Sequence, residues 1–374
     1  MYDKQLVAPL CVDFNITKRC NLKCHFCYAS AIEENGISEM TLEEIDKAFE
    51  SFNALNIHVV RISGGEPYMR RDICNIIDLT EKYNFSVCLN TNGTLLADKE
   101  ISHLKRSKVV SVGVSLDGPT CTVHEALRGV EGAYEKTLTA LKRMKNALED
   151  RLCVTYTITN KNCDVKVVEE TLNLIHSMGI SKVSFQLTSP VGRGDHCVVS
   201  APSYVQWKTL FLWLNQYKKE QKMCIGVHPT NEAPVFWEFY LPLLETNQLS
   251  DLSSVWKQDA SSNVNKCSTC RAGTSVIAIA SNGDVYPCEL MLSYEVLCVG
   301  NIEEKSFKSI WNDSPLLQSL SQMKLNSIGE PCASCTNHFC GGGCRAVAYA
   351  LHQDLFGLDN RCPLIGNCET KGEV

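Results

Sequence analysis

Short runs of β-branched and apolar residues alternate with amphipathic helical patterns from residue 9 to about residue 188, and this alternation limits the possible folds most strongly. We expect six strands, at residues 10–17, 58–63, 86–90, 109–116, 153–159 and 182–187. Helical periodicity is present between or after them, at residues 42–55, 71–83, 133–148 and 165–178. Strands that alternate with helices form βα units around a parallel sheet. Because a complete barrel has eight such units, six predict an α/β fold with a partial (β/α)6 TIM-type barrel.

The rest of the chain predicts further, smaller units. With 374 residues, 44% of them hydrophobic and 21% charged, the chain is long enough for a barrel-sized core and a second module. We expect a barrel domain at residues 1–190, a bridging helical region at 191–265 and a small cysteine-rich domain at 266–374. Helices are expected near 203–222 and 234–244 in the bridging region. In the last domain Asn282-Gly283 separates two short apolar runs, which predicts a β-hairpin.

Charge and hydrophobicity exclude several classes of protein. The 36 basic and 42 acidic residues give a net charge of −6, which provides no positive field for a nucleic-acid backbone. The first ten residues lack the pattern of a signal peptide, and no apolar run is long enough to span a bilayer. We therefore expect a cytoplasmic protein that binds neither nucleic acid nor membrane. In the reducing cytosol its 21 cysteines predict metal ligation instead of disulfides.

Three cysteines directly follow the first expected strand, at the end of a barrel where enzymes place their chemistry. Cys20, Cys24 and Cys27 are separated by three and two residues and are followed by Tyr28. Thiolates at this spacing suit an iron–sulfur cluster or zinc, for which His25 could provide a fourth ligand. Three cysteines would leave one iron of a cubane cluster open, as a reaction centre requires.

Glycine-rich and polar segments follow the next three expected strands. The second strand ends in Gly64-Gly65-Glu66-Pro67, where the glycines let a ligand approach the backbone and the acid can hold an amine. The third and fourth strands end in Asn90-Thr91-Asn92 and Ser115-Leu116-Asp117, whose polar groups could hydrogen-bond a ribose. All of these segments share one end of the barrel, which predicts a common binding pocket.

The CxxxCxxC motif followed by an aromatic residue resembles the radical S-adenosylmethionine (SAM) superfamily. The resemblance implies that Cys20, Cys24 and Cys27 hold a 4Fe-4S cluster whose open iron chelates SAM and cleaves it reductively to methionine and a 5′-deoxyadenosyl radical. It also implies a SAM-binding role for further residues. Gly64, Gly65 and Glu66 would bind the amino group, Pro67 would rigidify the turn, Tyr28 and Leu187 would lie near the adenine, Asn90, Asn92, Ser115 and Asp117 would line the pocket, and Arg128 would pair with the carboxylate. A zinc knuckle, an ordinary turn at residues 64–67 and a surface arginine are the alternatives.

The C-terminal cysteines form a second pattern: Cys270, Cys288, Cys332-x2-Cys335-x4-Cys340-x3-Cys344 and Cys362. It resembles the SPASM domain, which houses two auxiliary 4Fe-4S clusters, except that four residues instead of the usual five separate the second and third cysteines of the quartet. The resemblance implies one cluster on Cys270, Cys288 and Cys344, with Cys267 as the extra ligand, and another on Cys332, Cys335, Cys340 and Cys362. One or two zinc sites are the alternative. We expect the ten other cysteines to be structural: Cys11, Cys74, Cys88, Cys121, Cys153, Cys163, Cys197, Cys224, Cys298 and Cys368.

The substrate is constrained less than the cofactors. Glu289 aligns with an acidic position used as a substrate base in sulfatase-maturing relatives, and is otherwise a surface acid. SPASM enzymes mostly modify peptides and proteins, so the resemblance implies hydrogen abstraction from a peptide or protein side chain. The main alternative is a tetrapyrrole side-chain enzyme of the haem-biosynthesis type, whose C-terminus resembles residues 344–350 and Cys362-Pro363. Sulfatase formylglycine maturation is disfavoured by the residues around the first strand, and a plain electron carrier would leave residues 64–67 unexplained.

Two protein partners are expected beside the substrate. Only about nine residues precede the first strand, whereas some peptide maturases have an N-terminal leader-binding domain of several dozen residues. Any leader recognition would therefore require a separate leader-binding protein. Reductive cleavage of SAM also calls for an electron donor such as flavodoxin or ferredoxin.

Overall fold

The structure is a computed structural model that describes residues 5–33, 38–194, 199–220, 223–228, 237–258, 268–337 and 340–365. Cys197, Cys267 and Cys368 lie outside these described residues, so the predictions made for them are not addressed by the structure.

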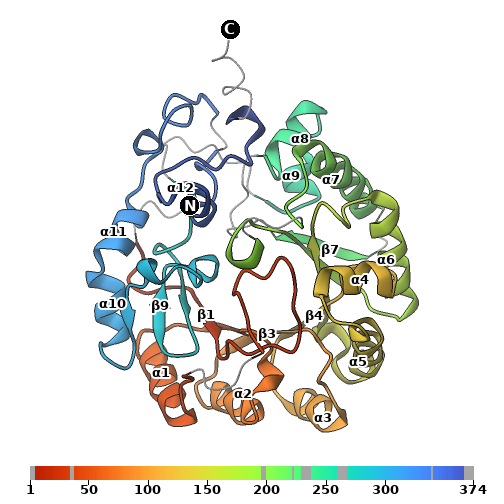
Figure 1. Ribbon diagram of the computed structural model, residues 1–374, viewed down its shortest axis with the longest axis vertical. Helices are drawn as coiled ribbons and strands as arrows, with labels where there is room; N and C mark the ends of the chain where they lie inside the picture. The colour runs from red at the N-terminus through yellow and green to blue at the C-terminus, as the bar shows by residue number, and fades with distance from the viewer. Residues whose placement is uncertain are drawn as a thin grey trace.

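Seven parallel strands form most of one ten-stranded sheet, whose order is β10-β9-β8-β1-β2-β3-β4-β5-β6-β7. The seven are β1 Cys11–Asn15, β2 Val59–Ser63, β3 Ser86–Thr91, β4 Ser111–Ser115, β5 Leu152–Ile158, β6 Lys182–Leu187 and β7 Cys224–His228. Each pairs in parallel with the next, and the helices lie around the outside of the sheet (Figure 1). The prediction of a partial barrel with six βα strands is confirmed. The seventh strand was not predicted, because Cys-Ile-Gly-Val-His is short and contains a glycine.

The helices follow the predicted periodicity with several additions. Those predicted in the barrel are α1 Leu42–Ala54, α2 Ile73–Lys82, α5 Ala133–Leu148 and α6 Val165–Ser177, while α3 Asp98–Arg106 and α4 Cys121–Arg128 were missed. In the bridging region α7 Tyr204–Lys219 matches its prediction. The helix expected at 234–244 is found as α8 Tyr240–Glu245, followed by α9 Asp251–Ser254, and residues 234–236 of that expected range lie outside the described part.

Successive side chains of each strand point to opposite faces of the sheet, so one face packs against the helices and the other faces the inside of the barrel. Outward residues such as Phe14, Ile62 and Val114 are fully buried under the helices. On α1 they meet Phe49, whose ring centroid lies 6.0 Å from that of Phe14. Inward residues are mostly small or polar, whereas the interior of an ordinary barrel is filled with bulky branched side chains. The barrel interior is therefore open for a ligand.

The predicted hairpin is present, and it extends the barrel sheet. Its strands are β8 Val276–Ile279 and β9 Asp284–Tyr286, with β10 Gly300–Asn301 beyond them. β8 pairs antiparallel with β9 but parallel with β1, where Cys11 lies opposite Val276. The hairpin was expected within a separate metal-stapled unit. Its position against β1 instead makes the C-terminal segment continuous with the barrel.

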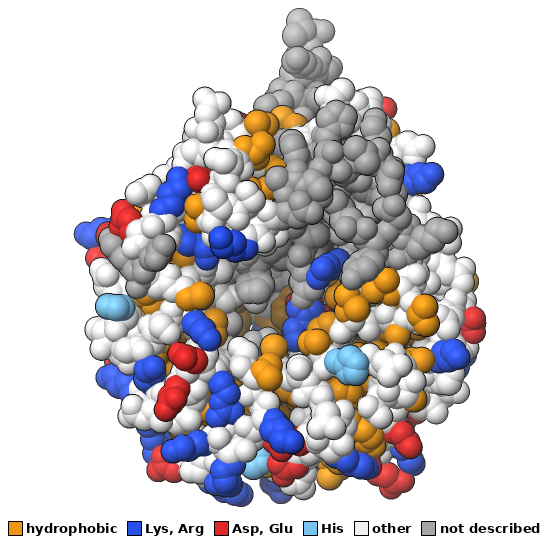
Figure 2. Space-filling model, turned by 180° about the vertical axis from the view of Figure 1, so that it is seen from behind, with side chains coloured by type: hydrophobic (Ala, Val, Ile, Leu, Met, Phe, Trp, Pro, Cys, Tyr) orange, Lys and Arg blue, Asp and Glu red, His pale blue; other side chains and the backbone are white. Residues whose placement is uncertain are grey.

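The described part of the C-terminal segment contains three further α-helices: α10 Phe307–Asp313, α11 Pro315–Ser321 and α12 Arg345–His352. α10 and α11 continue the outer ring of helices beyond α1 (Figure 1), and the rings of Phe52 and Phe307 lie 4.9 Å apart. On the face shown in Figure 2 acidic and basic side chains are interspersed. None of the described helices is long and apolar enough to cross a membrane.

Candidate active site

A cavity of about 420 Å³ occupies the inside of the barrel. Strands β1 to β6 all contribute inward-facing side chains to its wall, and the C-terminal segment closes one side with Cys288 and Glu289. The three N-terminal cysteines line the same cavity. The structure thus brings together two cysteine regions that are separated by more than 240 residues in the sequence.

The loop with Cys20, Cys24 and Cys27 is attached to the barrel through main-chain contacts. The amides of Lys23 and His25 donate to carbonyl oxygens at the end of α4, at 3.0 and 3.1 Å. On the other side Arg193 donates from its amide to the carbonyl of Cys27 at 3.0 Å and from Nε to that of Cys24 at 3.1 Å. Arg193 also lines the cavity. Sequence reasoning assigned no role to Arg193, because nothing in the local sequence indicates this distant contact.

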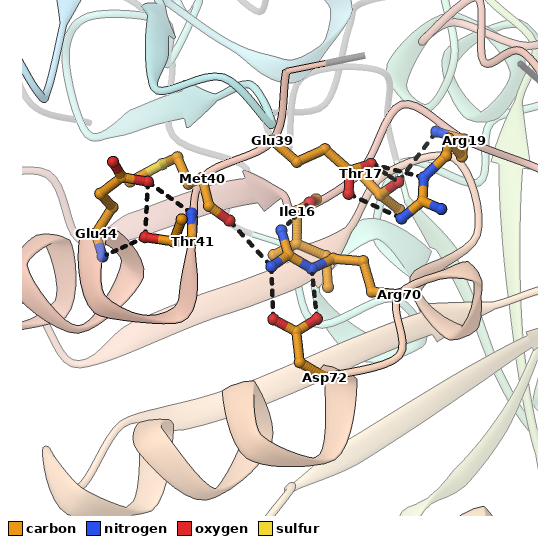
Figure 3. Close-up of polar contacts among 9 residues, drawn as sticks. All are labelled: Ile16, Thr17, Arg19, Glu39, Met40, Thr41, Glu44, Arg70 and Asp72. Carbon is orange, nitrogen blue, oxygen red and sulfur yellow. Dashed lines mark hydrogen bonds and ion pairs between the residues drawn. The ribbon is translucent and has the colours of Figure 1, made fainter. Parts of the chain in front are cut away.

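Buried and half-buried charged side chains hold the chain on either side of this loop (Figure 3). Glu39 accepts from Thr17 Oγ1 at 2.5 Å and from Arg19 Nη2 at 2.9 Å. Arg70, which is only 5% exposed, donates to the carbonyls of Ile16 and Met40, each at 3.0 Å, and pairs with Asp72 at 2.7 Å. Charge-assisted hydrogen bonds are stronger than neutral ones. They fix the end of β1, from which the cysteine loop emerges.

Gly64 and Gly65 pack directly against this loop. The Gly65 amide donates to the Thr17 carbonyl at 2.7 Å, and a Cβ at Gly65 would overlap the Arg19 carbonyl. Gly64 has a φ of +146°, which disfavours any residue with a side chain. The glycines therefore allow the second strand to end against the cysteine loop.

Glu66 lies behind the cavity wall. Its carboxylate accepts from Thr91 Oγ1 and the Asn92 amide, both at 2.7 Å, and from the Tyr68 amide at 3.1 Å. Burial raises the pKa of Glu66 to about 6, and these hydrogen bonds oppose that rise. Glu66 is thus a buried carboxylate that links the turn after β2 to the end of β3.

Arg128 connects the cysteine loop to a second buried carboxylate. Its Nε donates to Asp117 at 2.5 Å, its Nη1 lies 3.6 Å from Sγ of Cys24, and its guanidinium lies 5.1 Å from the Phe26 ring centroid. Asp117 also accepts from the amide of Thr157 at 2.8 Å. Asp117 therefore orients the guanidinium that faces the cavity.

The predicted SAM-binding residues fall into two sets. Eight line the cavity: Tyr28, Gly64, Gly65, Asn90, Asn92, Ser115, Arg128 and Leu187. Glu66, Pro67 and Asp117 are not part of its lining, although hydrogen bonds join Glu66 and Asp117 to residues that are.

The C-terminal cysteines gather into two groups. Cys270, Cys288 and Cys344 interact electrostatically, and each is buried. The second group is Cys332, Cys335, Cys340 and Cys362. Three of its members border a small cavity of about 20 Å³, which Trp237 and Asp359 also line. These groupings match the predicted division of ligands, apart from Cys267, which lies outside the described residues.

Six of the predicted cluster ligands share a local hydrogen bond. The amide two residues after the cysteine donates to Sγ, at 3.4 Å for Cys20, 3.5 Å for Cys335 and 3.4 Å for Cys340. The same donor serves Cys270, Cys288 and Cys362. An N–H directed at sulfur stabilises a thiolate. These loops are therefore built to hold negative sulfur.

A thiolate at these buried positions requires a nearby cation, because burial disfavours its negative charge. Burial raises the pKa of the Cys20 and Cys362 thiols to about 12, because a thiolate loses its hydration there. A bound metal deprotonates a coordinating thiol outright, so the donor sets fit metal clusters. In the described part of the chain no three ligand-type side chains are arranged to hold a single metal ion.

A charged cluster missed by sequence reasoning lies on the cavity wall. Asp13 on β1 pairs with Arg61 on β2 at 2.5 Å, and both line the cavity with Glu289. Burial and the nearby Glu289 charge raise the pKa of Asp13, while Arg61 lowers it. The available signal was a charged residue between two apolar ones, Val12 and Phe14, in a predicted strand.

Sequence comparisons agree with this arrangement. The radical SAM superfamily profile matches residues 14–161, and that of the SPASM iron-sulfur cluster-binding domain matches residues 270–336. The chain is 25% identical over 355 residues to the AdoMet-dependent heme synthase of Methanosarcina barkeri, covering 95% of this chain and 96% of that protein. It is 27% identical over 364 residues to the mycofactocin maturase MftC of Mycolicibacterium smegmatis, covering 96% and 84%.

Solved structures share the fold over nearly the whole chain. Streptococcus suis SuiB bound to the precursor peptide SuiA has a TM-score of 0.75 at 20% identity, over 96% of this chain and 77% of that one. Native anSMEcpe with bound AdoMet and Cp18Cys peptide has a TM-score of 0.68 at 19% identity, over 97% and 99%. The two matched domains identify the chain as an enzyme of the radical SAM superfamily with a C-terminal SPASM domain, whose cofactors are SAM and 4Fe-4S clusters.

Proposed function

We propose that the enzyme abstracts a hydrogen atom from a side chain of a ribosomally made peptide or of a protein, and so modifies it after translation. The observation that carries this proposal is one cavity lined both by the N-terminal cysteines and by Cys288 and Glu289. A side chain inserted into this cavity would meet the proposed SAM site and a proposed auxiliary-cluster site at once.

The cavity-lining residues supply the SAM site in this proposal. Gly64 and Gly65 offer backbone groups for the amino end of SAM, and Arg128 offers a guanidinium for its carboxylate. Tyr28 and Leu187 would lie near the adenine, and Asn90, Asn92 and Ser115 would hydrogen-bond the nucleoside. Pro67 would stiffen the turn, Glu66 would act at the amino end through the Asn92 backbone, and Asp117 would act through Arg128.

The cysteines divide into three sites for 4Fe-4S clusters. Cys20, Cys24 and Cys27 would hold the cluster that, when bound, supplies the electron for cleavage of SAM. Cys270, Cys288 and Cys344, with Cys267 as a further ligand, would hold the first auxiliary cluster. Cys332, Cys335, Cys340 and Cys362 would hold the second. The amides that donate to sulfur two residues after six of these cysteines support the assignment.

Glu289 is proposed as the base that takes a proton from the substrate. It lines the cavity next to Cys288, at the start of the short 3-10 helix Glu289–Met291. Arg61 and Asp13 line the same cavity, so the base would work beside one positive and one negative side chain that pair with each other. A general base must lie within reach of the proton it removes.

Modification of a tetrapyrrole side chain is the second candidate, because the AdoMet-dependent heme synthase is about as similar to this chain as MftC is. We favour the peptide because the cavity, about 420 Å³, is at the smaller end of the range of roughly 300–1,000 Å³ for ligand sites and has to admit SAM as well. Formylglycine maturation of sulfatases remains a third substrate class.

Location and partners follow from the cluster chemistry. We propose that the enzyme works in the cytoplasm, where its thiols stay reduced for iron binding. An electron donor such as flavodoxin or ferredoxin would reduce the SAM-cleaving cluster. A separate leader-binding protein would present a peptide substrate.

The first test is anaerobic reconstitution with iron and sulfide, then iron counting and an assay for 5′-deoxyadenosine from SAM and reductant. Three clusters correspond to about twelve irons per chain. The Cys20/Cys24/Cys27→Ala variant should retain about eight and lose SAM cleavage. Zinc in place of iron, or no cleavage by fully loaded protein, would refute the assignment.

The second test separates the substrate classes. Wild-type enzyme is incubated with SAM, reductant and either candidate precursor peptides encoded beside the gene or iron coproporphyrin, and products are followed by mass spectrometry. A mass change in a peptide that disappears in Glu289→Gln, but not in the surface control Glu303→Gln, supports the proposal. Turnover of the tetrapyrrole alone would favour the second candidate.

A further inference from the structure

Two buried N–H donors in the C-terminal half have no acceptor among the described residues: Nε of Arg345 and Nε1 of Trp237. The Arg345 side chain is completely buried and Trp237 is 2% exposed. A buried donor without a partner costs about 1–3 kcal/mol, and native proteins rarely leave one. Both donors therefore leave room for an acceptor beyond the described residues, such as a bound group.

The guanidinium of Arg345 is fixed by the backbone. Its Nη1 donates to the carbonyls of Leu355 and Gly357 at 3.0 and 2.8 Å, and its Nη2 donates to the carbonyl of Gly342. The hydrogen bonds of its two Nη atoms thus go to neutral carbonyl oxygens. The buried carboxylate of Asp359, which pairs with Arg361, interacts with the Arg345 charge through space.

The surroundings of Arg345 are sulfur atoms from both C-terminal cysteine groups. Its own amide donates to Cys270, and its charge acts on the thiols of Cys332 and Cys340. Arg345 therefore lies between the two groups. Anionic sulfur would provide the acceptor that Arg345 Nε lacks and a further counter-charge beside Asp359.

Trp237 approaches the second group from the bridging region. It lines the small cavity with Cys332, Cys340 and Cys362. Behind it, the Arg361 guanidinium lies 5.4 Å from the ring centroid and pairs with Asp359 at 2.8 Å. The indole is therefore held in place at the wall of this cavity.

We propose that Arg345 Nε and Trp237 Nε1 donate N–H···S hydrogen bonds to the second auxiliary cluster and raise its reduction potential. This inference rests on the proposed assignment of Cys332, Cys335, Cys340 and Cys362 to that cluster. A reduced cluster carries one more negative charge than an oxidised one, so donors and a buried cation stabilise it. Both residues are positioning residues, since neither touches the substrate.

The test is an EPR-monitored redox titration of Trp237→Phe and Arg345→Lys in the Cys20/Cys24/Cys27→Ala background, where only auxiliary clusters remain. Phe keeps an aromatic side chain at position 237, smaller than the indole and without an N–H, and Lys keeps the charge of Arg345 without Nε. The matched control is Trp311→Phe, because Trp311 is equally buried and its Nε1 donates to the Leu6 carbonyl at 2.8 Å, away from the cysteines.

We expect each test variant to lower the midpoint potential of one auxiliary cluster by about 59 mV. This shift corresponds to a tenfold change in the equilibrium constant of a one-electron reduction. Trp311→Phe should leave both midpoints unchanged. A second readout is the coupling of the reduced cluster to indole ¹⁵N in protein labelled at tryptophan, which should be present in the parent and absent from Trp237→Phe.

The outcomes of these experiments distinguish failure of this inference from failure of the cluster assignment. Unchanged midpoints in an iron-replete Trp237→Phe variant, together with no ¹⁵N coupling in the parent, would overturn the inference and leave the assignment intact. A parent protein that binds only one auxiliary cluster would overturn the assignment itself. If Arg345→Lys does not bind iron, Trp237→Phe decides the outcome, because it leaves the buried guanidinium and its backbone hydrogen bonds in place.

Discussion

Arg193 donates from Nε to the carbonyl oxygen of Cys24 at 3.1 Å, across 169 residues of sequence. This contact links the loop of the N-terminal cysteines to the segment that follows β6. The guanidinium also donates to the Ala31 carbonyl, so it spans the loop from one side to the other. The geometry of the loop with Cys20, Cys24 and Cys27 thus depends on a residue outside the cysteine motif.

Replacement of Arg193 by Ala should loosen the cysteine loop. Hydrogen bonds from a charged group are worth about 1.5–3 kcal/mol each, so we expect the variant to lose a large part of the four irons of one cluster. Iron counting after reconstitution measures the loss, and EPR shows which cluster is affected. Lys23→Ala is the control, because its pair with Glu33 is two-thirds exposed. Equal iron content in both variants would refute the role of Arg193.

Asp117→Asn should weaken SAM binding by removing the charge that orients Arg128. Loss of one partner from a buried ion pair costs about 3–5 kcal/mol. We expect the Kd for SAM to rise at least about tenfold, which corresponds to about 1.4 kcal/mol. Equilibrium binding to reconstituted protein measures this. Asp98→Asn, which removes the exposed pair with Arg143, should bind SAM as wild type does.

Gly65→Ala should damage the site through a steric clash. The new Cβ would overlap the Arg19 carbonyl, which cannot move without displacing the cysteine loop. We expect a loss of about 1–3 kcal/mol in stability, seen as a lower Tm, together with weaker SAM binding. Gly329→Ala is the control, since no atom lies within 4 Å of its Cβ position. A Gly65→Ala variant with normal Tm and SAM affinity would contradict the prediction.

His124 should make the fold sensitive to acid. Burial lowers its pKa from 6.5 to about 4, and its Nδ1 accepts from the Asp117 amide at 3.1 Å. The unfolded chain binds this proton at pH values where the folded protein does not. The free energy of unfolding should therefore fall by up to about 3 kcal/mol as the pH drops from 6.5 to 4. In urea titrations across this range His124→Asn should flatten the dependence, while replacement of the exposed His58 should leave it unchanged.

Six of the barrel strands and the cavity-lining residues of the strand-end motifs could be predicted from the sequence, because alternating strand and helix patterns are local features. Most inward-facing residues within the strands, such as Ser111 and Gln186, were not predicted. The motifs at strand ends could be expected to share one pocket, since parallel strands end at one edge of the sheet. The division of the C-terminal cysteines into two groups came from resemblance to a family, and local spacing alone would not have given it.

Contacts between distant segments could not be predicted in this way. Nothing near Arg193 indicates that it binds the cysteine loop, and the pairing of Asp13 with Arg61 depends on the register of β1 and β2. The hairpin was predicted from Asn282-Gly283, but a turn signal does not specify which strand lies beside it. The pairing of β8 with β1 is a tertiary property of this kind.

Because of that pairing, the C-terminal cysteine domain cannot be exchanged between relatives as an independent unit. β8 runs alongside β1 with Cys11 opposite Val276, so the ladder of main-chain hydrogen bonds leaves no hinge between the two. A slip of one residue would turn every inward side chain of β8 outward. A domain transplanted from a relative would therefore place its iron correctly only if the recipient's first strand were exchanged along with it.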